Sequence, residues 1–213
     1  RATAIQSLLR GKKGRQADKG GPRAESQSET LKVQGAPVLA PFNPTSAEGI
    51  AVALELLDLQ PGDVLLDLGC GDGRVLIQAV EEYGEITAVG VEYDGRHSER
   101  AQRSVVAKGL QERVTILHAD ATTTDTSQAS KVFIYLVPTG ARMMLPVLEG
   151  LRSRGVPVVS YTFSVPGWEP ANEVILSSGV KIRLYSGLQK EKTEQARCQA
   201  PGVMAASAED SEH

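Results

Sequence analysis

The stretch Val64-Leu65-Leu66-Asp67-Leu68-Gly69-Cys70-Gly71-Asp72-Gly73-Arg74 decides the fold of this 213-residue chain. Its first five residues form a short, mostly apolar run, as in a strand that is buried on both faces. Three glycines follow at alternate positions, and residues 74–83 then show the apolar spacing of a helix. This order predicts a strand that passes through a glycine loop directly into a helix.

Further strand-like runs alternate with intervals long enough for a helix. The runs that predict strands of the main sheet are 64–68, 86–91, 114–118, 132–136 and 156–163. Two later runs, 173–176 and 181–185, are joined by a link short enough for a hairpin. The pattern predicts an α/β fold, a doubly wound and mostly parallel sheet covered by helices on both faces, with an antiparallel hairpin at its carboxyl end.

A helix is also expected before the first strand. Thr45 and Glu48 have the spacing of a capping box, which marks the start of a helix. Apolar residues then fall on one helical face, at Ile50, Ala53, Leu54 and Leu57.

The two ends of the chain differ in composition from its middle. Residues 1–35 are rich in Arg, Lys, Gly, Gln and Ser, which predicts a disordered basic tail, either simply solvated or a mitochondrial targeting peptide. Residues 188–213 are polar in the same way and are also predicted to be disordered. Residues 36–187 are then expected to form one domain, because a chain of this length supports one sizeable core.

Charge, cysteine content and hydropathy limit the class of protein. The formal net charge of −3 gives no overall electrostatic reason to bind nucleic acid. Cys70 lies in the glycine loop and Cys198 in a polar tail, which favours a reducing compartment, mitochondrial or cytoplasmic, over a disulfide framework. No apolar run approaches the roughly 20 residues of a membrane-spanning helix, so no transmembrane segment is expected.

The glycine loop has three readings. A plain structural turn uses glycine freely, and a dinucleotide site requires glycine or alanine at position 74, which is Arg74 here. Asp67 and Asp72 flank the loop and would repel a pyrophosphate. A sulfonium nucleoside with an α-amino group carries positive charge that matches these acids, and Glu92 and Asp120 follow the next two strands, where they could accept hydrogen bonds from its ribose and adenine.

The loop from Asp67 to Arg74, followed by Glu92 and Asp120, resembles the first three motifs of class I S-adenosylmethionine-dependent methyltransferases. The resemblance implies a Rossmann-like fold with S-adenosyl-L-methionine as cofactor. It implies that the loop holds the methionine end, that Glu92 binds the ribose and that Asp120 lies beside the adenine, where Tyr93 could stack. The cofactor-binding residues predicted in this way are Asp67, Gly69, Cys70, Gly71, Gly73, Glu92, Tyr93, Asp120 and Ala121.

A narrower resemblance covers residues 37–187. The prologue Pro41-Phe42-Asn43-Pro44-Thr45, the glycine loop, and Ser160-Tyr161-Thr162-Phe163 with Pro166-Gly167-Trp168 look like one group of lysine methyltransferases. This group comprises small archaeal protein-lysine methyltransferases and the mitochondrial enzymes acting on the ATP synthase c-subunit and the adenine nucleotide translocase. It implies protein-lysine N-methylation, with a protein that presents a lysine as the partner.

Aromatic side chains are expected at the acceptor site. A lysine amine must be neutral to attack, and an apolar channel favours the neutral form without a dedicated base. We expect Tyr161 or Thr162 to position the amine in a channel lined by Phe42, Tyr135, Phe163 and Trp168. His97 and His118 fall in a predicted helix and strand and are interpreted as ordinary structure, and no metal is expected. The alternatives are a small-molecule N- or O-methyltransferase and a non-catalytic cofactor-binding relative.

Overall fold

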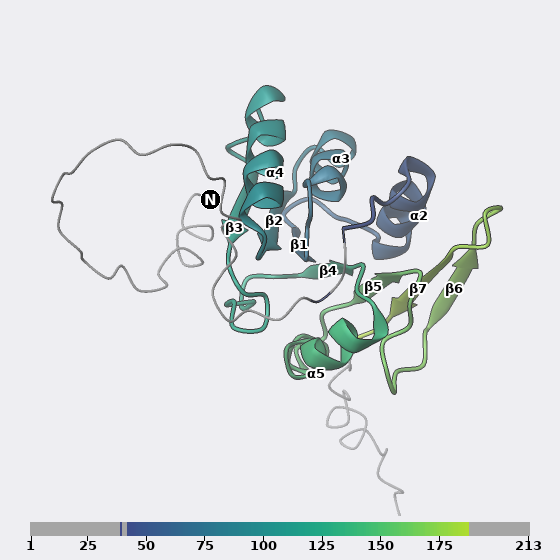
Figure 1. Ribbon diagram of the computed structural model, residues 1–213. Helices are drawn as coiled ribbons and strands as arrows, with labels where there is room; N and C mark the ends of the chain where they lie inside the picture. The colour runs from purple at the N-terminus through teal and green to yellow at the C-terminus, as the bar shows by residue number, and fades with distance from the viewer. Residues whose placement is uncertain (1–38, 40–41, 188–213) are drawn as a thin grey trace, which may run out of the picture.

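A computed structural model describes residue 39 and residues 42–187 (Figure 1). Its helices are α2 (Ala47–Leu57), α3 (Arg74–Glu82), α4 (Gly95–Ala107) and α5 (Pro138–Ser153). Its strands are β1 (Val64–Leu68), β2 (Thr87–Glu92), β3 (Val114–His118), β4 (Lys131–Ile134), β5 (Val158–Tyr161), β6 (Asn172–Ile175) and β7 (Lys181–Tyr185). Every predicted strand is present, and bounds differ from the prediction by at most two residues at either end.

The strands form one seven-stranded sheet in the order β3-β2-β1-β4-β5-β7-β6. Strands β1 to β5 pair in parallel, and β7 pairs antiparallel with both β5 and β6. The predicted doubly wound sheet and its terminal hairpin are therefore confirmed. The sequence runs outward from β1 to β3 and then returns to β4, so the carboxyl ends of β1 and β4 flank the point at which open α/β sheets bind ligands.

The two faces of the sheet are covered differently (Figure 1). Helices α2, α3 and α4 pack against one face, and α5 packs against the other. The interval between β3 and β4 was expected to hold a helix, but residues 119–130 form successive turns instead. Ala121 and Ala129 in this interval still bury their side chains against the face that α5 covers, so the interval closes the core without a helix.

The start of α2 differs from the sequence-based expectation by one residue. Ser46, not Thr45, is the N-cap, and its side-chain oxygen accepts a hydrogen bond from the Gly49 amide at 3.1 Å. Thr45 is buried instead. Ser and Thr are both favoured at N-caps, so a sequence pattern with the two side by side does not settle which of them caps the helix. The expected apolar face of the helix is buried as predicted, at Ile50, Ala53, Leu54 and Leu57.

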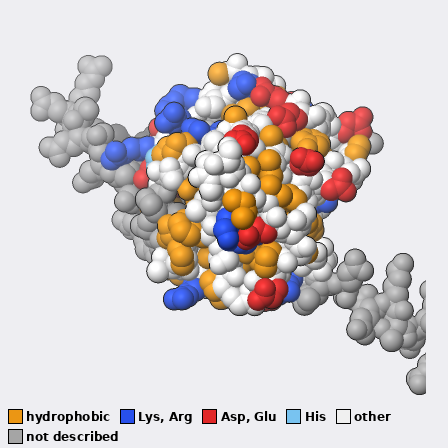
Figure 2. All heavy atoms as spheres, turned by 90° about the vertical axis from the view of Figure 1, so that its right-hand side faces the viewer, with side chains coloured by type: hydrophobic (Ala, Val, Ile, Leu, Met, Phe, Trp, Pro, Cys, Tyr) orange, Lys and Arg blue, Asp and Glu red, His pale blue; other side chains and the backbone are white. Residues whose placement is uncertain are grey.

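Both predicted tails lie outside the described residues, so their disorder and the targeting role of residues 1–35 stay predictions. Among the residues that the structure describes, no helix is long and apolar enough to cross a membrane. Figure 2 views the molecule from the β6 edge of the sheet. Hydrophobic, acidic and basic side chains are interspersed on the described part of this face, which shows no broad patch of one charge.

Two adjacent methionines of α5 test the packing of this helix. Met144 is 0% exposed in the core, whereas Met143 is 44% exposed. We expect Met144→Ala to lower the free energy of unfolding by about 2–5 kcal/mol, because it leaves a cavity under the helix. Met143→Ala removes the same atoms from the surface and should change it by about 0.5 kcal/mol or less. Urea denaturation measures both, and equal losses would contradict the packing of α5.

Candidate functional site

A cavity of about 420 Å³ opens at the carboxyl ends of β1, β2 and β4. One part of its wall comes from the glycine loop and the acids near it. Another part is aromatic and comes from the segment before α2, the segment after β4 and the end of β5. The residues that line the cavity include Phe42, Asn43, Asp67, Cys70, Asp72, Glu92, Tyr93, His97, Asp120, Ala121, Tyr135 and Phe163.

The glycines of the loop adopt backbone conformations that side chains rarely take. Gly71 has φ 56°, and a Cβ added there would meet the Phe42 ring at 2.9 Å. Gly73 has φ 78° and is the N-cap of α3, where an added Cβ would lie 3.2 Å from Ala101. Gly73 does not line the cavity, and its role is to let α3 begin against α4.

Glu92, at the end of β2, holds the loop in place. One carboxylate oxygen accepts a hydrogen bond from the Gly71 amide at 2.9 Å, and the other accepts one from the Asp94 amide at 2.9 Å. The side chain is only 6% exposed. The sequence-based expectation assigned Glu92 to a ribose. Each carboxylate oxygen has two lone pairs, so the two amide contacts leave acceptor capacity for sugar hydroxyls.

Asp67 is a buried acid without a cation. It is 2% exposed, and among the described residues no basic side chain forms an ion pair with it. Burial raises the pKa of the Asp67 carboxyl well above its usual range, and the negative charges of Glu92 and Asp72 raise it further. A positively charged ligand group in the cavity would relieve this cost.

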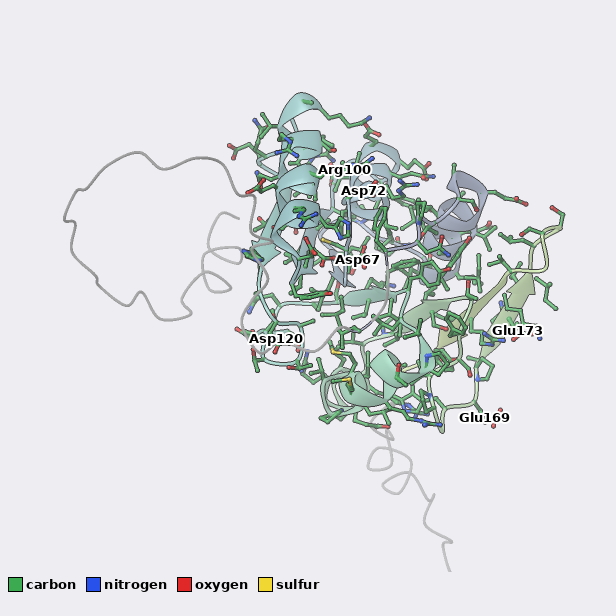
Figure 3. The ribbon with its side chains drawn as sticks, viewed as in Figure 1. Asp67, Asp72, Arg100, Asp120, Glu169 and Glu173 are labelled. Atoms are coloured by element: carbon green, nitrogen blue, oxygen red, sulfur yellow. The ribbon has the colours of Figure 1, made fainter. Side chains whose placement is uncertain are left out.

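Asp72 differs from Asp67 because it is already paired. Arg74 donates hydrogen bonds to it at 2.9 and 2.7 Å, and Arg100 lies 3.8 Å away. The hydrogen bonds from Arg74 lower the pKa of Asp72. Figure 3 shows Asp67, Asp72 and Arg100 on the same side of the molecule, far from Glu169 and Glu173. Asp72 is therefore paired with arginines, whereas no salt bridge among the described residues involves Asp67 or Glu92.

The other predicted cofactor residues also reach the cavity. Tyr93, Asp120 and Ala121 line it. Asp120 is held in a turn, in which one carboxylate oxygen accepts from the Thr122 amide at 2.8 Å and from its hydroxyl at 2.7 Å. Cys70 also lines the cavity. Burial raises the pKa of its thiol well above the usual range, which disfavours the thiolate form that would act as a nucleophile.

These observations fit S-adenosylmethionine. Gly69, Cys70 and Gly71 of the loop line the cavity, the Asp67 carboxyl has no salt bridge among the described residues, and Glu92 and Asp120 present acceptors on neighbouring strand ends. Pyrophosphate does not fit as well, because buried acids face the space it would occupy. Among residues 39 and 42–187, no group of three His, Cys, Asp or Glu side chains is arranged to hold a metal ion.

The aromatic part of the wall contains three of the six predicted acceptor residues. Phe42, Tyr135 and Phe163 line the cavity. Tyr161 is buried behind Tyr135, with ring centroids 4.8 Å apart in an edge arrangement. Its hydroxyl lies 3.3 Å from the Ser46 hydroxyl. Tyr161 therefore supports the wall from behind instead of touching the cavity.

Thr162 forms a strained turn that orients Phe163. The Phe163 amide donates to the Tyr161 carbonyl at 2.8 Å, and Thr162 has φ 68°, which is unusual for a β-branched residue. Arg183 donates to the Thr162 carbonyl at 2.9 Å. The Thr162 hydroxyl is buried without a partner and does not line the cavity. We therefore assign Thr162 to the backbone geometry of the wall rather than to direct contact with an amine.

Trp168 is placed elsewhere, which corrects the prediction that it lines the channel. It is buried in the core under α5, 5.6 Å from the Tyr185 ring centroid, and its indole donates to Glu149 at 2.5 Å. Arg152 lies over its ring. The backbone turns after Phe163, where the Val165 amide donates to the Tyr185 hydroxyl, so the next residues lie on the other face of the sheet.

His97 and Asn43 are among the cavity residues that were not assigned to the site from the sequence. His97, interpreted as ordinary helix, lines the cavity and packs against Phe42 with ring centroids 4.6 Å apart. Asn43 donates to the Tyr135 hydroxyl at 2.8 Å. A signal for His97 existed: α4 begins three residues after Glu92, so its first turn must lie beside the end of β2. Asn43 and Tyr135 are 92 residues apart, and no local pattern joins them.

Methyltransferases are among the known proteins that this chain resembles. The family described as the ANTKMT methyltransferase domain matches residues 67–172. A protein-lysine N-methyltransferase of Saccharolobus islandicus is 31% identical over 65% of this chain and 86% of its own length. The adenine nucleotide translocase lysine N-methyltransferase of Mus musculus is 28% identical over 61% of this chain and 56% of its own length.

Solved structures agree on the fold and the cofactor. An RNA methyltransferase from Salinibacter ruber in complex with S-adenosyl-L-homocysteine has a TM-score of 0.66 and 32% identity, covering 70% of this chain and 95% of that chain. A Streptococcus pneumoniae protein described as a putative tRNA (m1A22) methyltransferase has a TM-score of 0.55 at 21% identity and shares the fold.

The burial of Asp67 predicts that this residue lowers the stability of the fold and raises the affinity for the cofactor. Between the ordinary carboxyl pKa of about 3.9 and the raised pKa of Asp67, the folded state holds a proton that the unfolded state has lost, so Asp67 lowers stability as the pH rises. We expect Asp67→Asn to unfold at a higher urea concentration than the unsubstituted protein at pH 7, and the difference to vanish below about pH 4. The same variant should bind S-adenosylmethionine more weakly in calorimetry.

Asp125→Asn is the matched control, because Asp125 is exposed on the turn segment. It should shift neither the urea midpoint nor the cofactor affinity. If the difference in urea midpoint between Asp67→Asn and the unsubstituted protein does not change with pH, the proposed effect of burying Asp67 is contradicted.

Proposed function

Because the chain belongs to the protein-lysine methyltransferase family of class I S-adenosylmethionine-dependent methyltransferases, we propose that it methylates the side-chain amine of a lysine in a partner protein. The observation that carries the proposal is that one cavity joins an acid-lined glycine loop to an aromatic wall. The acid-lined loop suits a cationic cofactor. The aromatic wall suits an amine that must lose its charge before it reacts.

The cofactor roles follow from the positions of the acids. We propose that Asp67 and the loop Gly69-Cys70-Gly71 hold the methionine end, that Glu92 accepts from the ribose, and that Asp120 with Ala121 holds the adenine. Tyr93 lies at the cavity wall, where its ring offers a face for stacking. When bound, S-adenosylmethionine supplies an electrophilic methyl group on a positively charged sulfur.

The aromatic wall explains how the amine becomes reactive. A lysine in water has a pKa of about 10.4, so little of it is neutral at pH 7. Phe42, Phe133, Tyr135 and Phe163 surround the amine with rings, and removal of water lowers the pKa of a lysine. The lone pair of the neutral amine would form a bond to the methyl carbon while the methyl–sulfur bond breaks, which would leave S-adenosylhomocysteine, and the methylated ammonium would release its proton to solvent. The residues thus act by desolvation and positioning, without a dedicated base.

We also propose a mitochondrial location. Two properties support it: the basic composition of residues 1–35 and the similarity to an enzyme named for the adenine nucleotide translocase. A fluorescent protein fused behind residues 1–35 should enter mitochondria of cultured cells. Replacement of Arg10, Lys12, Lys13 and Arg15 by Glu should abolish entry, because import signals require positive charge. Cytoplasmic fluorescence of both fusions would contradict the proposal.

Label transfer tests the methyl acceptor. The protein is incubated with S-adenosylmethionine labelled in the methyl group and with a cell extract, and labelled residues are identified by mass spectrometry. We expect the label on lysine side chains of protein. Label on RNA, on another amino acid, or on a small molecule alone would overturn the proposal, and so would tight cofactor binding without any transfer.

A variant of the aromatic wall separates acceptor from cofactor binding. We expect Phe163→Ala to lower kcat/KM for the lysine acceptor by about 10- to 100-fold, because the amine loses its alignment. The dissociation constant of S-adenosylmethionine should not change. Ile175→Ala, at an exposed position on β6, is the control and should behave like the unsubstituted protein. Equal rates for the two variants would remove Phe163 from the acceptor site.

A further inference from the structure

We propose that Asn43 and Tyr135 act together as the positioning pair that accepts the N–H bonds of the substrate amine and thereby directs its lone pair toward the methyl group. The inference rests on the proposed function, because it assigns the acceptor site within that cavity. It also replaces Tyr161 and Thr162, which do not line the cavity, as the residues that hold the amine.

The pair joins two distant segments across the cavity. Asn43 lies before α2 and Tyr135 lies after β4, and the side-chain amide of Asn43 donates to the Tyr135 hydroxyl at 2.8 Å. Both residues line the cavity beside the rings of Phe42 and Phe163. The hydrogen bond therefore places two polar side chains within the aromatic part of the wall.

The geometry of the hydrogen bond leaves the acceptors that an amine requires. Because the Asn43 nitrogen donates, its carbonyl oxygen Oδ1 is available, and the Tyr135 oxygen keeps one lone pair after accepting from Asn43. A neutral primary amine has two N–H donors and one lone pair. When Oδ1 and Oη accept from the donors, the lone pair points away from both oxygens, free to attack.

The pair is held rigidly by its surroundings. The Tyr135 ring packs edge-on against Tyr161 at 4.8 Å and stacks with Phe163 at 6.4 Å. Tyr161 in turn contacts Ser46, three residues after Asn43. On the other side of Asn43, the Phe42 ring packs on His97. The segment that carries Asn43 is therefore fixed by contacts on both sides, as a positioning group requires.

Neutral oxygens suit this position better than a carboxylate. A carboxylate beside the amine would stabilise the ammonium form, which has no lone pair for the attack. The carboxylates of the cavity belong to the glycine loop and the ends of β2 and β3. The charged and titratable side chains that line the cavity around the pair are Asp67, Cys70, Asp72, Arg74, Glu92, Tyr93, Asp94, His97 and Asp120, and they are unchanged in the variants below.

The test compares two substitutions of Asn43, with a peptide spanning the labelled lysine as substrate. Asn43→Asp keeps an acceptor for the amine and adds a negative charge; its carboxylate cannot donate to Tyr135 and accepts from the Tyr135 hydroxyl instead. We expect the rising limb of its pH–rate profile to shift to a pH about 1 unit higher. At pH 7.5 kcat should then be about tenfold lower than in the unsubstituted protein, and at high pH the two values should be equal. Asn43→Leu removes the acceptor, and we expect kcat to fall about 10- to 100-fold at every pH.

Controls separate positioning from a structural role. Asn43 is exposed, so both variants should keep the unfolding midpoint and the S-adenosylmethionine affinity of the unsubstituted protein. Asn172→Asp and Asn172→Leu repeat the same changes on the exposed edge strand β6 and should leave the pH profile unchanged.

The outcomes distinguish this inference from the proposed function. If the unsubstituted protein labels no lysine, the proposed function fails and this inference fails with it. If lysine is labelled but both Asn43 variants keep the original kcat and pH profile, the positioning pair alone is overturned. Equal losses in both variants without a shift of the pH limb would also overturn it, because a purely structural defect has that signature.

Discussion

The Glu92 carboxylate is the contact on which the rest of the site depends. By accepting from the Gly71 and Asp94 amides, it joins the loop after β1 to the turn that starts α4. A buried carboxylate is stable only when its hydrogen bonds are satisfied, so these contacts hold the positive-φ conformation of the loop. Asp67 lies behind the same loop without a cation, and this leaves the site complementary to a positive charge.

The second constraint is the short segment from Phe42 to Ser46, which brings the aromatic wall of the cavity to the glycine loop. Phe42 packs on His97 of α4, Asn43 donates to Tyr135, the Thr45 carbonyl accepts from Arg74, and Ser46 contacts Tyr161. Four separate parts of the fold thus hold five consecutive residues. Since the same Phe42 ring lies against Gly71, a side chain at position 71 would displace this segment.

The strained turn at Thr162 has a comparable role on the opposite wall. Its positive φ is supported by hydrogen bonds from the Thr162 amide to the Lys181 carbonyl and from Arg183 to the Thr162 carbonyl. Local strain persists only where the surroundings hold it, and it often occurs at functional sites. Here it sends Phe163 to the cavity, while the chain continues to Trp168 on the other face of the sheet.

Local patterns in the amino-acid sequence were enough to predict the strands, the parallel order, the terminal hairpin and the glycine loop with its acids. Residues that lie close together in the sequence determine those features, because strand burial and loop geometry depend on near neighbours. The aromatic part of the cavity wall was predicted only in part. The contact of Asn43 with Tyr135, the place of His97, and the burial of Trp168 under α5 each depend on which distant segments meet, and only the tertiary structure decides that. Aromatic residues occur equally in cores and in binding sites, so their type alone could not separate Phe163 from Trp168.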